Sequence, residues 1–329
     1  MNPVSVIVCA RNEENNLIKN LPAILNQEYP DFEVVVVNDC SMDDSEHLLR
    51  ELESQYKNLK VVNIYEHERF KHGKKFAVTL GIKAAKHEFL LFTDADCQPN
   101  SYQWLRIMQA NFTGEAEIVL GYSPYERLSG FINKLIRFET FLTALNYFSF
   151  ALAGKPYMGV GRNMAYTKSL FFKGKGFASH MHLASGDDDL FVNQNSTSTN
   201  TVIEINADAQ IWSEPKKTFS SYTSQKLRHL SASKAYKPEH RKMLGFQAGS
   251  AILFYITLIT LVFFNAPWQI LMTIYFIRLT IQYIIYIPVF KRLTYPDLIW
   301  WLPVLDFIYY IYMLTLTVVS IFKKRIYWK

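Results

Sequence analysis

The chain has 329 residues, of which 50% are hydrophobic and 19% are charged, below the charged share of about 25% that is typical of soluble domains. Its formal net charge is +6, a mild excess that suits an anionic membrane surface or a phosphate-bearing substrate. The sequence has no basic helix, zinc-ligand pattern or RNA-binding signature, so a nucleic-acid partner is not expected.

The N-terminal part of the chain alternates short apolar runs with amphipathic segments. Continuous apolar runs rich in β-branched residues, bounded by polar turns, are typical of strands that are buried on both faces. They predict strands over 4–9, 32–38, 60–65 and 88–93, separated by helices over 11–27, 44–56 and 74–86. This alternation indicates an α/β, Rossmann-like domain with a mostly parallel sheet and right-handed crossovers.

Polar side chains follow three of these strands, where each strand ends. Because ligands of such sheets bind beyond the carboxyl ends of the strands, these side chains are expected to form one site. Lys74 opens a helix without the P-loop pattern and could reach a phosphate or a base. The expected ligand-binding residues are Ala10, Arg11, Glu13, Asp39, Lys74, Asp94 and Asp96.

Asp94-Ala95-Asp96 is the sharpest of these motifs. Two carboxylates with one spacer, on the turn after a buried strand, supply the oxygen ligands that Mg²⁺ or Mn²⁺ prefers, and such an ion commonly bridges a diphosphate. The alternative is a solvated acidic turn, because short D-x-D patterns are frequent by chance.

A second acidic motif is Asp187-Asp188-Asp189. Adjacent carboxylates raise one another's pKa, which is unfavourable unless the cluster serves a purpose such as proton abstraction or metal binding. Capping of a helix N-terminus is the alternative, and it accounts for one aspartate more easily than for three.

Gln225 and Arg228 are three residues apart, so on a helix they share a face. A guanidinium group can bind phosphate through two parallel hydrogen bonds, and an amide can bind a hydroxyl group. A solvated basic helix near a membrane is the alternative reading of this segment.

From residue 244 onward the sequence is almost entirely apolar, which divides the chain into a globular domain over 1–243 and a transmembrane region over 244–329. Three segments, over 244–264, 268–290 and 298–322, are long enough to cross a hydrocarbon core of about 30 Å. Residues 130–154 form a further apolar helix, which lies either in the headgroup layer or in a protein core.

Two charged residues, Arg278 and Asp306, fall inside the expected second and third spans. Charges within a bilayer are costly and usually paired, so these two are expected to pair; the alternative is contact with a lipid headgroup. If all three segments cross the membrane, Lys323, Lys324 and Arg325 lie outside, against the positive-inside rule. Either the rule fails here or one segment is re-entrant.

Taken together, the motifs resemble those of family 2 glycosyltransferases, in the membrane-bound branch that includes ceramide glucosyltransferases and polysaccharide synthases. The resemblance runs from Val4 to about His229, and it implies a GT-A fold, a nucleotide-sugar donor and inversion at the anomeric carbon. The matching segments, in the family's order, are Val4–Glu14, Val36–Ser41, Gly73-Lys74 with Ala77, Asp94–Asp96, Gly186–Asp188 and Gln225–Arg228.

The resemblance also implies roles for the donor-site residues. Asp39 and Lys74 would hold the nucleotide, Asp94 would bind donor phosphate or ribose, and Asp96 would bind a divalent metal ion, Mg²⁺ or Mn²⁺. The donor is expected to be a UDP-sugar.

On the acceptor side, the resemblance makes Asp188 the general base within the motif that includes Asp187. Gln225 and Arg228 would hold the acceptor and the diphosphate. The family's Q-x-x-R-W motif ends here in His229 instead of Trp. That difference, with only three short spans, disfavours processive polymer synthesis.

We therefore expect a metal-dependent transfer of one sugar to a lipid or lipid-linked acceptor. The protein would be a multi-pass protein of the bacterial inner membrane, with its catalytic domain on the cytoplasmic side because no signal peptide precedes Val4. The alternatives are a processive polysaccharide synthase and a non-catalytic membrane subunit that only binds sugar nucleotide.

Overall fold

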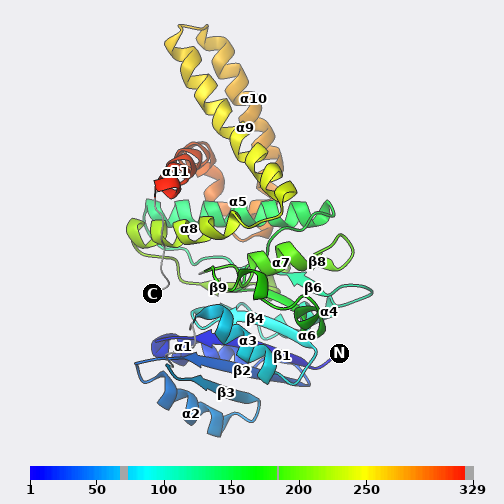
Figure 1. Ribbon diagram of the computed structural model, residues 1–329. Helices are drawn as coiled ribbons and strands as arrows, with labels where there is room; N and C mark the ends of the chain where they lie inside the picture. Colours follow the sequence, from blue (N-terminus) through cyan, green and yellow to red (C-terminus); the bar gives the residue numbers. More distant parts are fainter. Residues whose placement is uncertain (67–72, 184, 323–329) are drawn as a thin grey trace. The chain divides into compact units, whose positions relative to one another are not determined.

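The computed structural model describes residues 1–66, 73–183 and 185–322, which form two compact units (Figure 1). The first unit comprises Met1–Glu126 and Asn146–Pro215, and the second comprises Arg127–Leu145 and the described chain from Lys216 onward. The basic residues Lys323, Lys324 and Arg325, on which the topology argument partly depends, lie outside the described residues.

The first unit begins with the strand–helix alternation that the sequence predicts. Its elements are β1 (Val4–Ala10), α1 (Glu14–Leu25), β2 (Phe32–Asp39), α2 (Ser45–Gln55), β3 (Leu59–Ile64), α3 (Lys74–Ala84) and β4 (Phe89–Asp94). The α1 helix buries Leu17, Leu21 and Ile24, which recur at helical spacing and so face the sheet together. All seven elements are confirmed, with ends within a few residues of the predictions.

The remaining elements of this unit are shorter and were not predicted from the sequence. They are β5 (Cys97–Pro99), α4 (Trp104–Ala110), β6 (Ile118–Leu120), β7 (Met164–Thr167), α6 (Lys168–Lys173), η1 (Ala178–His180), α7 (Asp189–Asn195), β8 (Thr201–Ile203), η2 (Ala207–Ala209) and β9 (Ile211–Ser213). The strands β5 and β9 pair antiparallel as a separate small ribbon.

The main sheet has seven strands in the order β3-β2-β1-β4-β7-β6-β8. The pairings β3–β2, β2–β1, β1–β4 and β6–β8 are parallel, whereas β7 runs antiparallel to both of its neighbours. The predicted mostly parallel sheet is therefore confirmed. Because β7 is reversed, its first residue, Met164, pairs with Phe92 near the carboxyl end of β4. The segment before Met164 thus reaches the edge where Asp94 lies.

Close packing of α3 against the sheet depends on Gly81. A Cβ atom at this position would lie 2.8 Å from Cγ2 of Ile7 on β1 and 3.0 Å from Cγ2 of Val37 on β2. Such distances are too short for two carbon atoms, so a side chain here would push the helix outward. Glycine therefore lets α3, with Lys74 as its first residue, lie directly on the strands that end at the predicted site.

The second unit is helical. Its elements are the first part of α5 (Phe131–Leu152), α8 (Phe219–Ser233), α9 (Pro238–Phe263), α10 (Trp268–Arg292), η3 (Pro296–Trp301) and α11 (Leu302–Phe322). Among the described residues, three segments are long and apolar enough to cross a membrane: Pro238–Phe263, Trp268–Arg292 and Pro296–Ser320. They coincide with the three predicted spans to within two residues, except that the first begins six residues earlier, at Pro238. Proline is favoured in the first turn of a helix, which explains this earlier start.

The charged residues within these spans form one polar cluster. Nη2 of Arg278 on α10 lies 2.9 Å from Oδ2 of Asp306 on α11. Nε2 of Gln282 donates to the other carboxylate oxygen at 3.0 Å, and the hydroxyl of Tyr255 on α9 donates to Oδ2 at 2.5 Å. The predicted Arg278–Asp306 pair is confirmed, and together with the bond from Tyr255 it joins the three helices through buried and partly buried hydrogen bonds. Whether residues 130–154 also contact the headgroup layer stays a prediction.

Candidate active site

Lys74 lies at the centre of the acidic residues that the sequence singled out. Its Nζ is 2.8 Å from Oδ1 of Asp94, at the end of β4, and 3.3 Å from Oδ2 of Asp187. Burial would lower the pKa of Lys74, but the charges of Asp187 and Asp94 outweigh it and hold that pKa well above its ordinary value. The lysine therefore stays protonated and joins residues that are far apart in the sequence.

Asp94, Asp96 and Cys97 each place one ligand atom within 4.8 Å of the others, which is compact enough for a single metal ion. Burial raises the pKa of the Cys97 thiol well above its ordinary value, and the sulfur donates a hydrogen bond to Oδ1 of Asp96 at 3.2 Å. Mg²⁺ and Mn²⁺ prefer oxygen to sulfur, so the carboxylates of Asp94 and Asp96 are the chemically suitable ligands for such an ion.

Asp188 is held by two backbone amides. Its Oδ2 accepts a hydrogen bond from the N–H of Gly161 at 2.8 Å, and its Oδ1 accepts one from the N–H of Asp189 at 2.8 Å. Burial, followed by the charge of Asp187, raises the pKa of Asp188, although Lys74 and the two amides act in the opposite direction. Asp188 is therefore a fixed carboxylate that is more basic than an ordinary aspartate.

Asp188 also precedes α7 as its N-cap residue, so the capping alternative holds for this one aspartate. Asp189 uses its own Oδ1 to accept the N–H of Leu190 at 2.7 Å. Asp187 is not the N-cap residue, and its carboxylate lies beside the ammonium group of Lys74. The three adjacent carboxylates thus have three different surroundings.

The loops after β1 and β2 are joined to each other. The N–H of Asn12 donates to the hydroxyl of Ser41 at 2.9 Å, and the N–H of Met42 donates to Oδ1 of Asn12 at 2.7 Å. Asn12 and Cys40 have φ angles of 56° and 53°, in the left-handed region that non-glycine residues seldom adopt. Backbone of this kind occurs frequently at ligand sites, where the surrounding structure enforces it.

Four predicted residues lie in these two loops or at the strand ends that lead into them. Asp39, the last residue of β2, is buried, and its Oδ1 has no hydrogen-bond partner among the described residues. Ala10 ends β1, Arg11 is exposed, and Glu13 is the N-cap residue of α1, where it accepts a hydrogen bond from the side chain of Asn16. A buried carboxylate oxygen without a partner is unfavourable unless a ligand donates to it.

Gln225 and Arg228 lie three residues apart on α8, as predicted, but α8 belongs to the second unit. They are therefore not among the side chains that the first unit brings together around Lys74. Their neighbour Lys226 pairs with Glu139 of α5 at 2.6 Å, within the second unit.

The sequence reasoning missed several residues around the acidic cluster. Nζ of Lys75 donates to the backbone carbonyls of His180 and Leu183, at 2.6 and 3.1 Å, and so holds the segment that leads to Asp187. The Arg162 guanidinium lies 4.1 Å from the ring centroid of Tyr125 and donates to the carbonyl of Ser123 at 3.2 Å. The sequence does contain one indication of this region. Gly159 and Gly161 are separated by one residue, and glycines so close together often mark a place where the backbone passes close to another segment.

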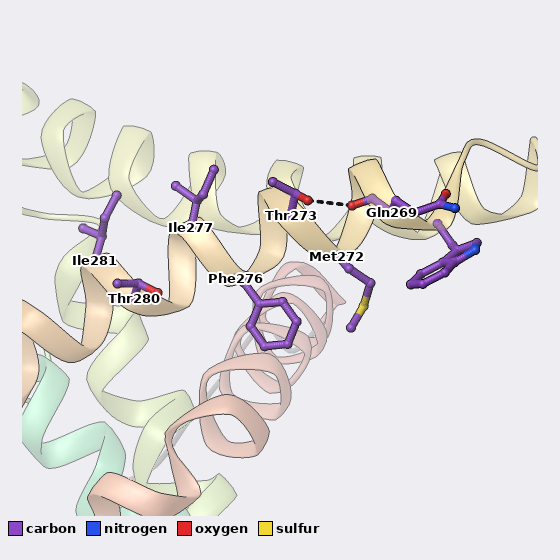
Figure 2. Close-up of a pocket in the computed structure, with 8 residues that line it drawn as sticks. Gln269, Met272, Thr273, Phe276, Ile277, Thr280 and Ile281 are labelled. Carbon is purple, nitrogen blue, oxygen red and sulfur yellow. Dashed lines mark hydrogen bonds between the residues drawn. The ribbon is translucent and has the colours of Figure 1, made fainter.

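A small pocket opens among these side chains. Its lining includes Cys9, Lys74, Asp94, Gly161 and Asp187. A larger hollow lies on one face of α10, lined by apolar and uncharged polar side chains from Trp268 to Ile281 (Figure 2). That hollow contains no ionisable residue, and the only hydrogen bond that Figure 2 draws joins Thr273 to the Gln269 carbonyl of the same helix. Of the two, the small pocket is the one lined by ionisable side chains that the sequence singled out, namely Lys74, Asp94 and Asp187.

Comparison with known proteins identifies the family to which these motifs correspond. The family model "Glycosyl transferase family 2" matches residues 5–173. Glycosyltransferase AglE of Haloferax volcanii is 33% identical over 120 residues, which are 36% of this chain and 38% of that protein. The chain thus spans well under half of that relative's length.

Two further proteins match over longer stretches. The dolichyl N-acetyl-alpha-D-glucosaminyl phosphate 3-beta-D-2,3-diacetamido-2,3-dideoxy-beta-D-glucuronosyltransferase of Methanococcus voltae is 27% identical over 220 residues, 60% of this chain and 67% of that protein. Mannosyltransferase PcManGT of Pyrobaculum calidifontis, solved with GDP-Man and Mn²⁺, is 17% identical with a TM-score of 0.55, and the alignment covers 94% of this chain and 86% of that one. This structural likeness establishes the predicted fold.

Proposed function

The chain belongs to glycosyl transferase family 2 and is a nucleotide-sugar glycosyltransferase with a GT-A fold; from this premise, we propose that it transfers one sugar, with inversion, to a lipid-linked acceptor at a membrane. The single observation that carries the proposal is the arrangement around Lys74, which gathers Asp94 and Asp187 beside a fixed, basic Asp188.

The donor would lie at the carboxyl edge of the sheet. Asp39 presents a buried carboxylate oxygen that can accept a hydrogen bond from the base or ribose of a UDP-sugar. Lys74 would exchange part of its contact with Asp94 and Asp187 for the donor diphosphate. A Mg²⁺ or Mn²⁺ ion held by Asp96 with Asp94 would neutralise diphosphate charge, a role for which their oxygen ligands are suited.

Asp188 would act as the general base. The Gly161 and Asp189 amides fix both of its oxygens, so one lone pair can point at an acceptor hydroxyl without rotation of the carboxylate. The hydroxyl oxygen would attack the anomeric carbon as its proton passes to Asp188, and the bond to the diphosphate would break. Gln225 and Arg228 would hold the acceptor and the departing diphosphate.

A lipid-linked acceptor is favoured by two observations. The second unit carries three helices that could cross a membrane, and the Methanococcus voltae relative is named for a dolichyl-linked acceptor. The products separate this proposal from the main alternative, a processive polysaccharide synthase. Label from the donor should enter a product that extracts into organic solvent; label in long aqueous polymer would select the synthase.

The donor is testable with the purified chain. We expect one nucleotide sugar from a panel to release nucleoside diphosphate in the presence of Mg²⁺ or Mn²⁺, with a UDP-sugar as the best donor. Binding of a donor without any turnover, with or without lipid extract, would select the non-catalytic membrane subunit instead.

We further propose that the first unit faces the cytoplasm of a cell whose inner membrane holds the three helices. A cysteine introduced at the exposed Glu115, in a variant lacking Cys9 and Cys40, tests this orientation. An impermeant maleimide should label it in inverted vesicles and not in intact cells; labelling from outside would contradict the assignment.

A further inference from the structure

A cluster of basic and aromatic residues in the second unit takes no part in the proposed reaction. It forms where the start of α5 meets η3, the short helix that leads into α11. Nη1 and Nη2 of Arg137 lie 2.8 and 2.6 Å from the two carboxylate oxygens of Asp297, and the Arg137 guanidinium lies 4.4 Å from the ring centroid of Tyr295. These contacts fix the two segments against each other.

The charges in this cluster do not balance. Asp297 is the one carboxylate that these ion pairs share, and the buried Arg137 occupies both of its oxygens. Arg127 reaches Asp297 only at 3.6 Å and leaves 73% of its side chain exposed. Lys134 has no ion pair among the described residues and lies 4.5 Å from the ring centroid of Trp301. Arg127, Lys134 and Arg137 carry three positive charges against the single negative charge of Asp297, so these four side chains have a formal net charge of +2, which suits an anionic partner.

Exposed apolar side chains border these cations. Trp300 is 86% exposed, and Trp301 and Phe131 are also exposed. The two tryptophans fall within Pro296–Ser320, near the start of the third segment that could cross a membrane. Tryptophan is enriched where a span meets the headgroup layer, and lysine or arginine at that level attracts anionic lipid.

We propose that Arg127, Lys134, Trp300 and Trp301 form a binding site for the headgroup phosphate of an anionic phospholipid of the surrounding bilayer. The phosphate would lie between the two cations, while the indole rings lie at the boundary between headgroups and acyl chains. Arg137 and Asp297 would position the site without contacting the lipid. The site holds α5 and the start of α11 at one membrane level, and it is independent of the glycosyl transfer proposed above.

The full-length chain in nanodiscs of phosphatidylcholine and phosphatidylglycerol tests the proposal. Native mass spectrometry would record how much phosphatidylglycerol stays bound after delipidation. The double variant R127Q/K134Q should bind it roughly 10- to 30-fold more weakly, as expected for two surface cations. The charge-conserving R127K/K134R should retain it. The Arg137–Asp297 pair is intact in both variants, so their melting temperatures should match the wild type.

A matched control separates this site from general charge attraction. R241Q/K242Q removes one arginine and one lysine that are exposed at the start of α9, another segment that could cross a membrane. This variant should keep most of its bound phosphatidylglycerol. Equal loss in both double variants, or unchanged binding in R127Q/K134Q, would overturn the proposal.

Discussion

The backbone N–H of Gly161 donates a hydrogen bond to Oδ2 of Asp188 at 2.8 Å. The two residues come from different segments: Gly161 precedes the reversed strand β7, and Asp188 precedes α7. A Cβ atom at position 161 would lie 3.3 Å from Cβ and Oδ2 of Asp188, which is tighter than ordinary contact. Glycine therefore lets the proposed base lie directly against the β7 segment.

Gly161→Ala should disturb the base without unfolding the protein. Its φ is not in the left-handed region, so alanine can adopt the backbone conformation, and only the contact with Asp188 must change. A displacement of a few tenths of an ångström should lower kcat by roughly threefold to tenfold and leave donor affinity unchanged. Steady-state kinetics with donor titration by calorimetry measures both, and a normal kcat would show that this contact does not position the base.

The pH dependence of activity should report the basicity of Asp188. Because its pKa is raised by burial and by Asp187, kcat/KM should fall as the pH drops, with its midpoint above the ordinary aspartate value of about 3.9. In Asp187→Asn one cause of the raised pKa is gone, so the midpoint should move to lower pH. Asp208→Asn, an exposed carboxylate in η2, serves as the control. A midpoint unaffected by Asp187→Asn would contradict the assignment.

The first four strands and their helices were predictable because their pattern is strong. Val34 to Val37 are all buried, and a run of that kind fits only a strand that is covered on both faces. The later strands have three or four residues each and lack a periodic pattern, so their places depend on long-range pairing, such as Met164 with Phe92. Local sequence carries no information on such pairing.

The same distinction applies to the site. Asp94 and Asp96 were recognisable because they follow a predicted strand directly. Lys75 was not, because its role comes from two backbone carbonyls more than a hundred residues away, at His180 and Leu183. The burial of Cys97 beside Asp96 likewise comes from the fold, and spacing alone does not reveal it. Contacts of this kind appear only once the chain is folded.

Metal dependence is a separate prediction. Chelation should abolish transfer, and Mg²⁺ or Mn²⁺ should restore it, because Asp94 and Asp96 offer hard oxygen ligands. Asp96→Ala should weaken donor binding as well as turnover. Cys97→Ser, which keeps a hydrogen-bond donor beside Asp96, should remain active. Full transfer after exhaustive chelation would remove the metal from the mechanism.

The polar cluster between the apolar helices should matter for stability. Arg278→Leu alone leaves Asp306 buried without its cation, and we expect a loss of about 3 kcal/mol, the lower end for a broken buried pair, since Arg278 is partly exposed. The double variant R278L/D306L should be less destabilised than either single variant. Thermal unfolding in detergent measures this, and additive effects would mean that the pair contributes no coupling.

Asp188→Asn tests the central claim most directly. The amide side chain is similar in size to the carboxylate but cannot take a proton from the acceptor hydroxyl. Turnover should fall about 10²- to 10⁴-fold, the usual contribution of a positioned general base. Asp189→Asn should be milder, because Oδ1 of Asp189 already accepts the N–H of Leu190 within the first turn of α7 and an amide oxygen can accept the same bond. Donor affinity by calorimetry should stay near wild type in the Asp188→Asn variant while transfer collapses. If this variant retains most of its turnover, the base lies elsewhere and the account of the site is wrong.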